Sequence, residues 1–96
     1  MRWTWDEAKD RINRQKHKLG FETAARVFDD PLAVSRHDSH SGEERLQTVG
    51  AIGGVIVLVV HTHPLYDPKS DEEVGRIISA RKATKNERRA YEEGDF

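Results

Sequence analysis

The sequence contains no cysteine, which excludes disulfide bonds, thiolate catalysis and cysteine-based zinc sites. This composition fits a reducing, cytoplasmic setting. There is also no long apolar run: the longest, Val55 to Val60, is far shorter than the ~20 apolar residues of a membrane-spanning helix. Arg2 is not followed by the apolar stretch of a secretory signal. We therefore expect a cytoplasmic protein that has no membrane segment.

Charge, by contrast, is abundant. Charged residues make up 34% and hydrophobic residues 35% of the 96 residues, so we expect one domain, 1–96, with a modest core. The net charge is only −1, but residues 1–18 carry six basic and three acidic side chains, and residues 76–90 carry six basic and one acidic. These basic ends are either solvated helix faces or, if they meet in the fold, one positive patch.

The N-terminal third predicts a short strand and two helices. Arg2–Trp5 alternates like an edge strand, and the helix after it, 6–17, begins at a capping box of Thr4 and Glu7 or at Asp6 as the rival N-cap. The spacing places Ala8, Ile12 and the stem of Gln15 on a thin apolar stripe, and Lys9, Asn13 and Lys16 on a different face. After a break at Gly20, a second amphipathic helix carries Phe21, Ala24, Ala25 and Phe28 and stops at Asp30-Pro31.

The remainder predicts strands and a final helix. Strands are expected at 32–37, 43–52, 55–60 and 74–81, with turns at 39–42 and at Gly53-Gly54, a loop at 63–71, and a helix at 83–93. The run 55–60 has no polar alternation and should be a central strand buried on both faces. The predicted class is α+β: two N-terminal helices, an antiparallel sheet of about four strands, and a C-terminal helix. The helices should cover one sheet face and leave the other partly open.

Several residues along these elements stand in a distinctive order. They are Trp5-Asp6, Lys9, Asn13, Lys16-His17, Phe21, Ala24, Phe28, Asp30-Pro31, Gly42-Glu43-x-Arg45, Gly50, Arg76-Ile77-Ile78-Ser79-Ala80-Arg81-x-Ala83, Glu87-Arg88 and Tyr91. With this order and spacing, the chain resembles the BrnT family of toxins from Trp5 to Tyr91. It departs at Lys18, where the family usually turns with glycine; here Gly20 comes two residues later.

The resemblance implies a RelE-like fold and a ribonuclease toxin of a type II toxin–antitoxin system that cleaves RNA without metal or cofactor. Such a toxin inhibits translation and growth. The resemblance further implies neutralisation by a BrnA-type antitoxin in a heterotetramer of two toxins and two antitoxins, with operator DNA contacted through the antitoxin.

Metal-free RNA cleavage needs a base for the 2′-hydroxyl, cations around the phosphorane and an acid for the leaving oxygen. Arginine suits the cationic role, so Arg45, Arg76 and Arg81 are predicted phosphate contacts, with Arg81 favoured at the scissile phosphate. Because Arg76 and Arg81 are five residues apart, a regular strand would point them to opposite faces. Either a bulge redirects one, or one anchors the final helix or the partner.

For proton transfer the candidates are His17, Lys9, Lys16, Glu43 and Tyr91. His17 titrates nearest neutral pH, but a histidine here also caps a helix favourably. Lys9 and Lys16 are better suited to phosphate contacts than to the role of a base, because a lysine base needs burial to lower its pKa. Glu43 could instead pair with an arginine, and Tyr91 could pack in the core, as helix tyrosines often do. Trp3 and Trp5 could stack on bases, although Trp5 fits the core better. We expect Arg76, Arg81, His17 and Tyr91 to be catalytic, and Lys9, Lys16, Arg45 and Arg88 to bind RNA.

Two alternatives remain at this point. His61-x-His63, with His37 and His40 nearby, could hold a metal, but no HExxH spacing exists and we expect no metal site. The chain could also be a non-catalytic partner-binding module, or an inactivated toxin that acts in a DNA-binding repressor complex. No helix-turn-helix pattern with a plausible recognition helix stands out.

Overall fold

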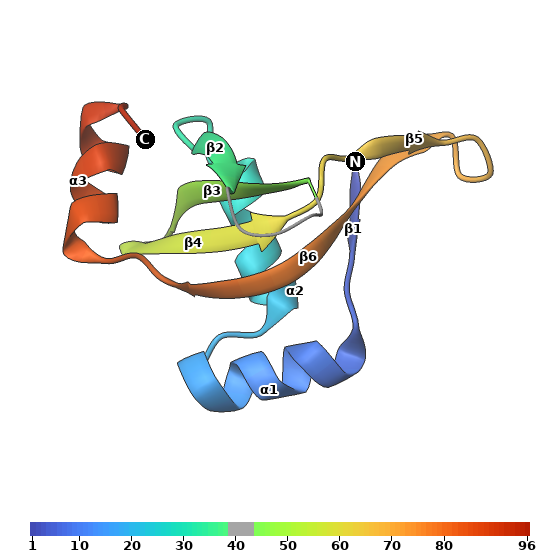
Figure 1. Ribbon diagram of the computed structural model, residues 1–96, viewed down its shortest axis with the longest axis horizontal. Helices are drawn as coiled ribbons and strands as arrows, with labels where there is room; N and C mark the ends of the chain where they lie inside the picture. The colour runs from blue at the N-terminus through green and yellow to red at the C-terminus, as the bar shows by residue number, and fades with distance from the viewer. Residues whose placement is uncertain (39–43) are drawn as a thin grey trace.

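The computed structural model describes residues 1–38 and 44–96 (Figure 1). Its class is α+β, as predicted. The predicted turn at 39–42 lies outside the described residues, as does Glu43. The elements, in chain order, are β1 (Arg2–Thr4), α1 (Glu7–His17), α2 (Phe21–Ala24), the 3₁₀-helix η1 (Ala25–Asp29), β2 (Val34–Asp38), β3 (Arg45–Ile52), β4 (Val55–His61), β5 (Leu65–Asp67), β6 (Glu72–Lys82) and α3 (Lys85–Glu93).

The strands form a mixed sheet in the order β1-β6-β4-β3-β2, with β5 paired to β6. The four longer strands, β2, β3, β4 and β6, pair antiparallel as predicted, and β4 is central. The antiparallel prediction was wrong for β1, which runs parallel to β6, and the predicted loop at 63–71 contains β5. Both strands are three residues long, too short for a hydrophobic period to reveal their pairing.

The hairpin at the end of β3 and β4 is confirmed. Ile52 pairs with Val55, so Gly53 and Gly54 form a two-residue turn. Gly53 has φ 60°, whereas Gly54 does not have a positive φ, which is the pattern of a type II′ turn. A glycine is favoured at the first turn position because other residues are strained at positive φ.

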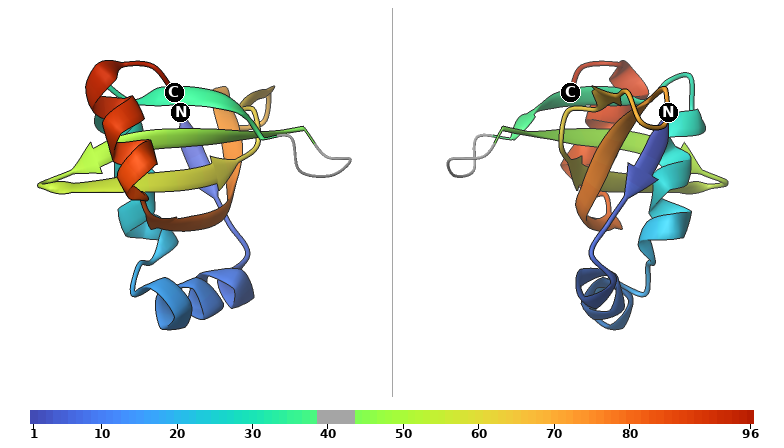
Figure 2. Two further views of the ribbon diagram at one scale, coloured as in Figure 1. Left: turned by 60° about the vertical axis from the view of Figure 1, so that its left-hand side comes forward. Right: turned by 90° about the vertical axis from the view of Figure 1, so that its right-hand side faces the viewer.

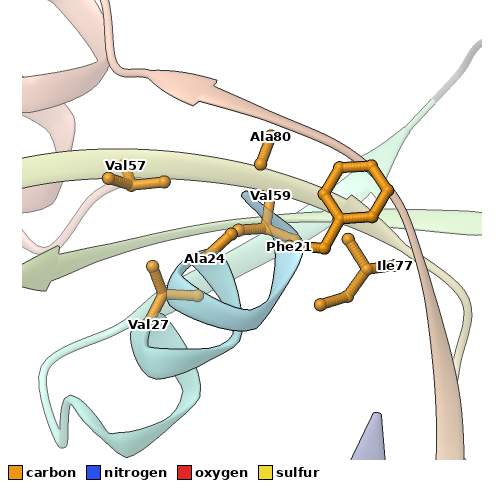
Figure 3. Packing of buried hydrophobic residues seen from close by; sticks show 7 residues of the cluster. All are labelled: Phe21, Ala24, Val27, Val57, Val59, Ile77 and Ala80. Carbon is orange, nitrogen blue, oxygen red and sulfur yellow. The ribbon is translucent and has the colours of Figure 1, made fainter. Parts of the chain in front are cut away.

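The core lies between the sheet and the α2–η1 segment (Figure 3). The predicted second helix, 21–28, is a single turn of α-helix followed by a 3₁₀-helix. The fully buried side chains Phe21, Ala24 and Val27 recur every three residues, which is the period of a 3₁₀-helix and not of an α-helix. The segment ends at Asp29, before Asp30-Pro31, as predicted. The core cluster comprises Phe21, Ala24, Val27, Val57, Val59, Ile77 and Ala80.

Helix α1 packs through polar side chains, so the predicted apolar stripe was wrong. Ile12 is 60% exposed, whereas Asp10 and Asn13 are buried. The Asn13 amide donates to the Ala80 carbonyl at 2.9 Å and accepts from the Ala80 N–H at 3.3 Å. It thereby pairs with the edge of β6 beyond the point where β1 stops, since β1 pairs only with Val74–Arg76. The two basic segments of the chain meet at this contact.

The ends of α1 decide between the two predicted N-caps and correct the position of the turn. The N-cap is Asp6, whose carboxylate accepts from the N–H groups of Ala8 and Lys9, while the Thr4 hydroxyl donates to the Gly75 carbonyl on the neighbouring strand. At the other end Lys18 adopts a left-handed conformation with φ 58°. The chain therefore turns at Lys18 and not at Gly20, and Lys18 occupies a position that usually favours glycine.

The helices lie on both sides of the sheet, contrary to prediction. Helix α2 and η1 cover one face, α1 runs below the β6 edge, and α3 lies across the opposite face (Figure 2). No residue of α3 is buried. On this second face Val49 and Leu58 are buried, whereas Arg76 is exposed, so the face is only partly covered. Within residues 1–38 and 44–96, no helix is long and apolar enough to cross a membrane.

Candidate functional site

A bulge in β6 decides where its arginines point. Val60 pairs with Ser79, but the next residue, His61, pairs with Ile77, so Ile78 is an extra residue on β6. Alternation along the strand then places Arg76, Ser79 and Arg81 on one face of the sheet. The opposite face of β6 carries Ile77 and Ala80, which belong to the core. The bulge that the five-residue spacing allowed is therefore confirmed.

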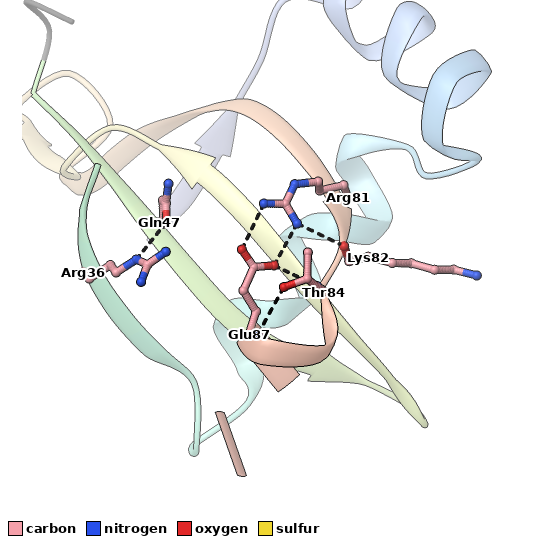
Figure 4. Close-up of polar contacts among 6 residues, drawn as sticks. All are labelled: Arg36, Gln47, Arg81, Lys82, Thr84 and Glu87. Atoms are coloured by element: carbon pink, nitrogen blue, oxygen red, sulfur yellow. Dashed lines mark hydrogen bonds and ion pairs between the residues drawn. The ribbon is translucent and has the colours of Figure 1, made fainter. Parts of the chain in front are cut away.

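We call the sheet face that bears Arg76, Ser79 and Arg81 the arginine face. By register, Gln47 of β3 lies on the same face as Ser79, because Gln47 and Ser79 both pair with Val60. Arg36 of β2 pairs with Gln47, and its Nε donates to Gln47 Oε1 at 2.9 Å (Figure 4).

Arg45 belongs to the arginine face too, since it lies two residues before Gln47 on β3. Its Nε lies 3.4 Å from a carboxylate oxygen of Asp38, the residue opposite it on β2. The face thus carries polar side chains from three strands, four of them arginines: Arg36, Arg45, Arg76 and Arg81.

Arg81 is held by a two-pronged ion pair with Glu87 of α3. Nη1 donates to Oε1 at 2.8 Å and Nη2 donates to Oε2 at 3.0 Å (Figure 4). This pairing raises the pKa of Arg81 and lowers the pKa of Glu87. Glu87 also forms a capping box with Thr84, whose N–H donates to Oε1 at 2.8 Å. Arg81 therefore lies on the arginine face and also anchors the final helix, which combines two outcomes that the sequence left as alternatives.

Arg76 lies nearer the other end of β6, and its side chain is exposed. Its backbone is fixed by Thr62: the Arg76 N–H donates to Thr62 Oγ1 at 3.0 Å, and the Thr62 N–H donates to the Arg76 carbonyl at 3.0 Å. Hydrogen bonds thus hold the backbone of β6 on both sides of the bulge, and they fix the backbone positions of Arg76 and Arg81.

His17, a predicted catalytic residue outside the sheet, lies apart from this face. His17 ends α1 and lines a hollow with Ile52, Val57 and Lys82, which is on the core-face side of the sheet. The structure therefore does not bring His17 together with Arg76 or Arg81. Three of the predicted RNA-binding residues are exposed on helices: Lys9, Lys16 and Arg88.

Tyr91 ties α3 to the segment after η1. Its hydroxyl donates to Asp30 Oδ2 at 2.6 Å, which raises the pKa of Tyr91 and lowers the pKa of Asp30. The same oxygen of Asp30 accepts from the Ala51 N–H at 2.8 Å, at the edge of β3 that β2 leaves unpaired. In this arrangement Tyr91 is a structural contact of α3.

The two tryptophans and His61 pack against other aromatic rings. Trp3 stacks on Phe28 with ring centroids 4.0 Å apart, and the Trp5 ring meets Phe21 edge-on. His61 is buried, with its ring edge-on to Trp3 and Phe28. Close packing of Trp3 requires Gly75, because a Cβ there would lie 2.4 Å from the indole ring.

The rival metal constellation is not assembled around His61. The rings of His37 and His63 lie with their centroids 6.0 Å apart. Among residues 1–38 and 44–96 no group of three or more His, Cys, Asp or Glu side chains is placed to hold a metal ion. His40 lies outside the described residues.

Sequence reasoning missed Arg36, Gln47, Ser79 and Glu87 as members of this site. The Thr84-x-x-Glu87 spacing is a capping-box signal that was open to detection, and it locates Glu87 at the start of α3. Arg36 and Gln47 could not be found in the same way, because their pairing depends on strand register.

These features define a small α+β protein with an arginine-rich sheet face tied to a C-terminal helix. Residues 5–87 match the family described as the ribonuclease toxin, BrnT, of type II toxin–antitoxin systems. The match covers most of the sequence, and the chain belongs to this family. A type II system pairs its toxin with a protein antitoxin. No curated protein sequence matches the chain.

Proposed function

We propose that this protein cleaves RNA on the arginine face without a metal ion, and that cleavage inhibits translation and growth. In such a reaction the 2′-hydroxyl loses its proton and its oxygen attacks the adjacent phosphorus. The 5′-oxygen then leaves with a proton from an acid, and a 2′,3′-cyclic phosphate remains. Arginines aimed at the phosphorane stabilise the charge that accumulates there.

The observation that carries this proposal is the bulge at Ile78, because it places Arg76 and Arg81 on the same face of the sheet. Arg45 adds a further cation on that face, and the side chains of Arg36 and Arg76 are exposed there. Strand backbone positions such side chains more rigidly than a loop does. We propose Arg76 and Arg81 as catalytic residues, with Arg81 at the scissile phosphate, and Arg45 as an RNA contact.

The remaining predicted residues receive less support from the geometry. Lys9, Lys16 and Arg88 are exposed and remain proposed RNA contacts. The proton-transfer roles of His17 and Tyr91 are less favoured. His17 lies on the other side of the sheet, and the Tyr91 hydroxyl donates its hydrogen bond to Asp30. A role for Tyr91 as an acid requires the Asp30 contact to open.

For the partner, we propose a BrnA-type antitoxin that binds this toxin in a heterotetramer of two toxins and two antitoxins in the cytoplasm. In this arrangement the antitoxin contacts operator DNA.

The test is cleavage of a defined RNA by the purified protein in the presence of EDTA. Wild type should yield products ending in a 2′,3′-cyclic phosphate. Arg76→Ala and Arg81→Lys should slow cleavage by about 100-fold, the usual size of a lost transition-state contact. Arg11→Ala removes an exposed arginine of α1 and is the matched control, with an unchanged rate. Cleavage that stops in EDTA, or that is unchanged in both arginine variants, contradicts the proposal.

A second candidate function has its own supporting observation. Arg45 and Arg81 are each paired with a carboxylate, Asp38 and Glu87, which compete with a phosphate for them. This favours an inactivated toxin or a partner-binding module in a repressor complex. Growth arrest after induced expression separates the two: wild type that neither arrests growth nor degrades RNA, yet still binds the antitoxin, supports the second candidate.

A further inference from the structure

A second concave surface lies on the opposite side of the sheet from the arginine face. It is a hollow of about 180 Å³ at the β3–β4 hairpin. Its floor is aliphatic: Ile52 and Val55 flank the turn, Val57 follows on β4, and Leu19 comes from the connection between α1 and α2. Val55 is 44% exposed, so part of this apolar surface faces solvent.

The rim of the hollow is cationic. His17 and Lys18, at the end of α1, and Lys82, at the end of β6, line it together with the aliphatic residues. Both lysine side chains are exposed. No acidic residue lines this hollow. The site therefore combines an apolar floor with a rim of positive charge.

We propose that this hollow anchors the antitoxin, by receiving an aliphatic side chain from a segment that carries acidic residues beside it. We call it the anchor hollow. This inference rests on the proposed function in so far as that function supplies an antitoxin partner. It goes further by assigning the surface and the chemistry of the segment that binds there.

Size and chemistry select this occupant over a small molecule. Pockets for cofactors and drug-sized ligands usually measure about 300–1,000 Å³ and contain a few converging polar groups. At about 180 Å³, with an almost wholly apolar floor, the anchor hollow has room for one or two aliphatic side chains. Interfaces between proteins are commonly dominated by such buried anchors, surrounded by a polar rim.

Charge selects the antitoxin over a second copy of this chain. A two-fold contact through the anchor hollow would bring Lys18 and Lys82 of one copy toward the same lysines of the other, which is unfavourable. An acidic segment instead complements the rim and is attracted to it during association. Because the hollow lies on the core-face side, an anchor there leaves the arginine face to a different part of the antitoxin or to RNA.

The test measures the Kd of the protein for a purified BrnA-type antitoxin, with RNA cleavage measured in parallel. Val55→Glu should raise the Kd by about 30-fold, the size of a lost interface anchor. Lys82→Glu should raise it by about fivefold and reduce its dependence on salt. The matched controls are Leu65→Glu and Lys69→Glu, which change exposed residues at or beside β5, and neither should alter the Kd. All four variants should cleave RNA at the wild-type rate.

Lys82→Glu changes an exposed side chain, so it keeps the test decisive if Val55→Glu reduces folding. An unchanged Kd in Lys82→Glu and in folded Val55→Glu overturns the proposal. A loss of RNA cleavage with unchanged antitoxin affinity also overturns it, because the hollow would then be an RNA contact. A change in self-association alone overturns it as well.

If wild type binds the antitoxin but leaves RNA intact, the ribonuclease proposal fails while the anchor hollow is still tested. If wild type does not bind the antitoxin, the anchor hollow fails whatever the result with RNA.

Discussion

The two faces of the sheet are built from the same strands but are held together by different forces. On the core face, Phe21, Ala24 and Val27 pack against Val57 and Val59 with almost no exposed surface. This packing is non-directional and depends on the apolar area removed from water. Across the arginine face α3 buries none of its residues, and directional polar contacts attach it to the rest of the molecule.

Three contacts show how α3 and the chain after it are attached. Near the start of the helix, Glu87 forms the two-pronged pair with Arg81. Toward the end of the helix, the Tyr91 hydroxyl donates to Asp30. Beyond the helix, the centroid of the Phe96 ring lies 4.1 Å from the Arg36 guanidinium. Arg36 and Arg81 are thus side chains of the arginine face that also hold this segment. The comparison teaches that the core face is held by apolar packing, whereas the arginine face buries Val49 and Leu58 but also couples its charges to a weakly buried helix.

The largest effect is expected at the centre of the core face. Phe21 is fully buried, so Phe21→Ala removes a ring and leaves a cavity, which should lower the free energy of unfolding by about 3–5 kcal/mol. Urea denaturation measures this loss. Leu65→Ala, at a 72% exposed position, is the control and should change stability little. A loss below ~1 kcal/mol for Phe21→Ala would contradict the assignment of the core.

Asn13 tests whether the edge of β6 depends on a helix side chain. In Asn13→Ala the N–H and carbonyl of Ala80 lose their amide partner, and the Leu19 carbonyl loses a donor. Unsatisfied buried polar groups are costly, so the free energy of unfolding should fall by about 2–4 kcal/mol. The control is Gln15→Ala, an exposed position on the same helix. Hydrogen exchange at the Ala80 amide should accelerate most; unchanged exchange there would disprove the edge contact.

On the core face, His61 should make stability depend on pH. Burial between Trp3 and Phe28 lowers the pKa of His61 below its ordinary 6.5. The bond to the Thr62 carbonyl opposes this shift of the pKa, and the nearby His63 adds to it. Below pH 6.5 the unfolded chain takes up a proton that the folded chain does not. The free energy of unfolding should therefore fall as the pH falls from 6.5 toward the lower folded pKa, by at most ~1.4 kcal/mol per pH unit.

The comparison variant for this pH dependence is His61→Gln, which does not titrate. Its amide group can still contact the Thr48 hydroxyl, which lies 2.6 Å from His61 Nε2 in wild type. Denaturation of both proteins between pH 7 and pH 5 measures the difference. Parallel curves for wild type and variant over this range would show that His61 is not the group responsible.

The smallest effect is expected where α3 meets the arginine face. Glu87→Gln removes the charge of the pair with Arg81, and because the Arg81 side chain is 38% exposed, the loss of stability should be only about 1 kcal/mol. Amide exchange should accelerate in α3 and remain unchanged in α2 and η1. Glu92→Gln, an exposed change on the same helix, is the control. Faster exchange throughout the core would show that the two faces are not independent.

The sequence by itself determined those features whose signal lies within a few neighbouring residues. The apolar run 55–60 identified the central strand, Gly53-Gly54 identified the hairpin, and Asp30-Pro31 identified the end of the second helical segment. The ordered set of residues from Trp5 onward was also sufficient to identify the family, which the match over residues 5–87 confirms. Local periodicity and turn chemistry depend only on neighbouring residues, so they can be recognised without knowing which elements pack together in the fold.

Only the tertiary structure decided which partners those elements meet. Asn13 was expected to share a face with Lys9 and Lys16, away from the apolar stripe, yet it is buried because it pairs with the edge of β6 at Ala80, 67 residues further along the chain. The spacing of Arg76 and Arg81 left two alternatives, a bulge in the strand or an anchoring role for one arginine. The structure has both: the register of β6 against β4 includes a bulge, and Arg81 anchors α3 through Glu87. Strand register and edge contacts are set by residues distant in sequence, and no local pattern records them.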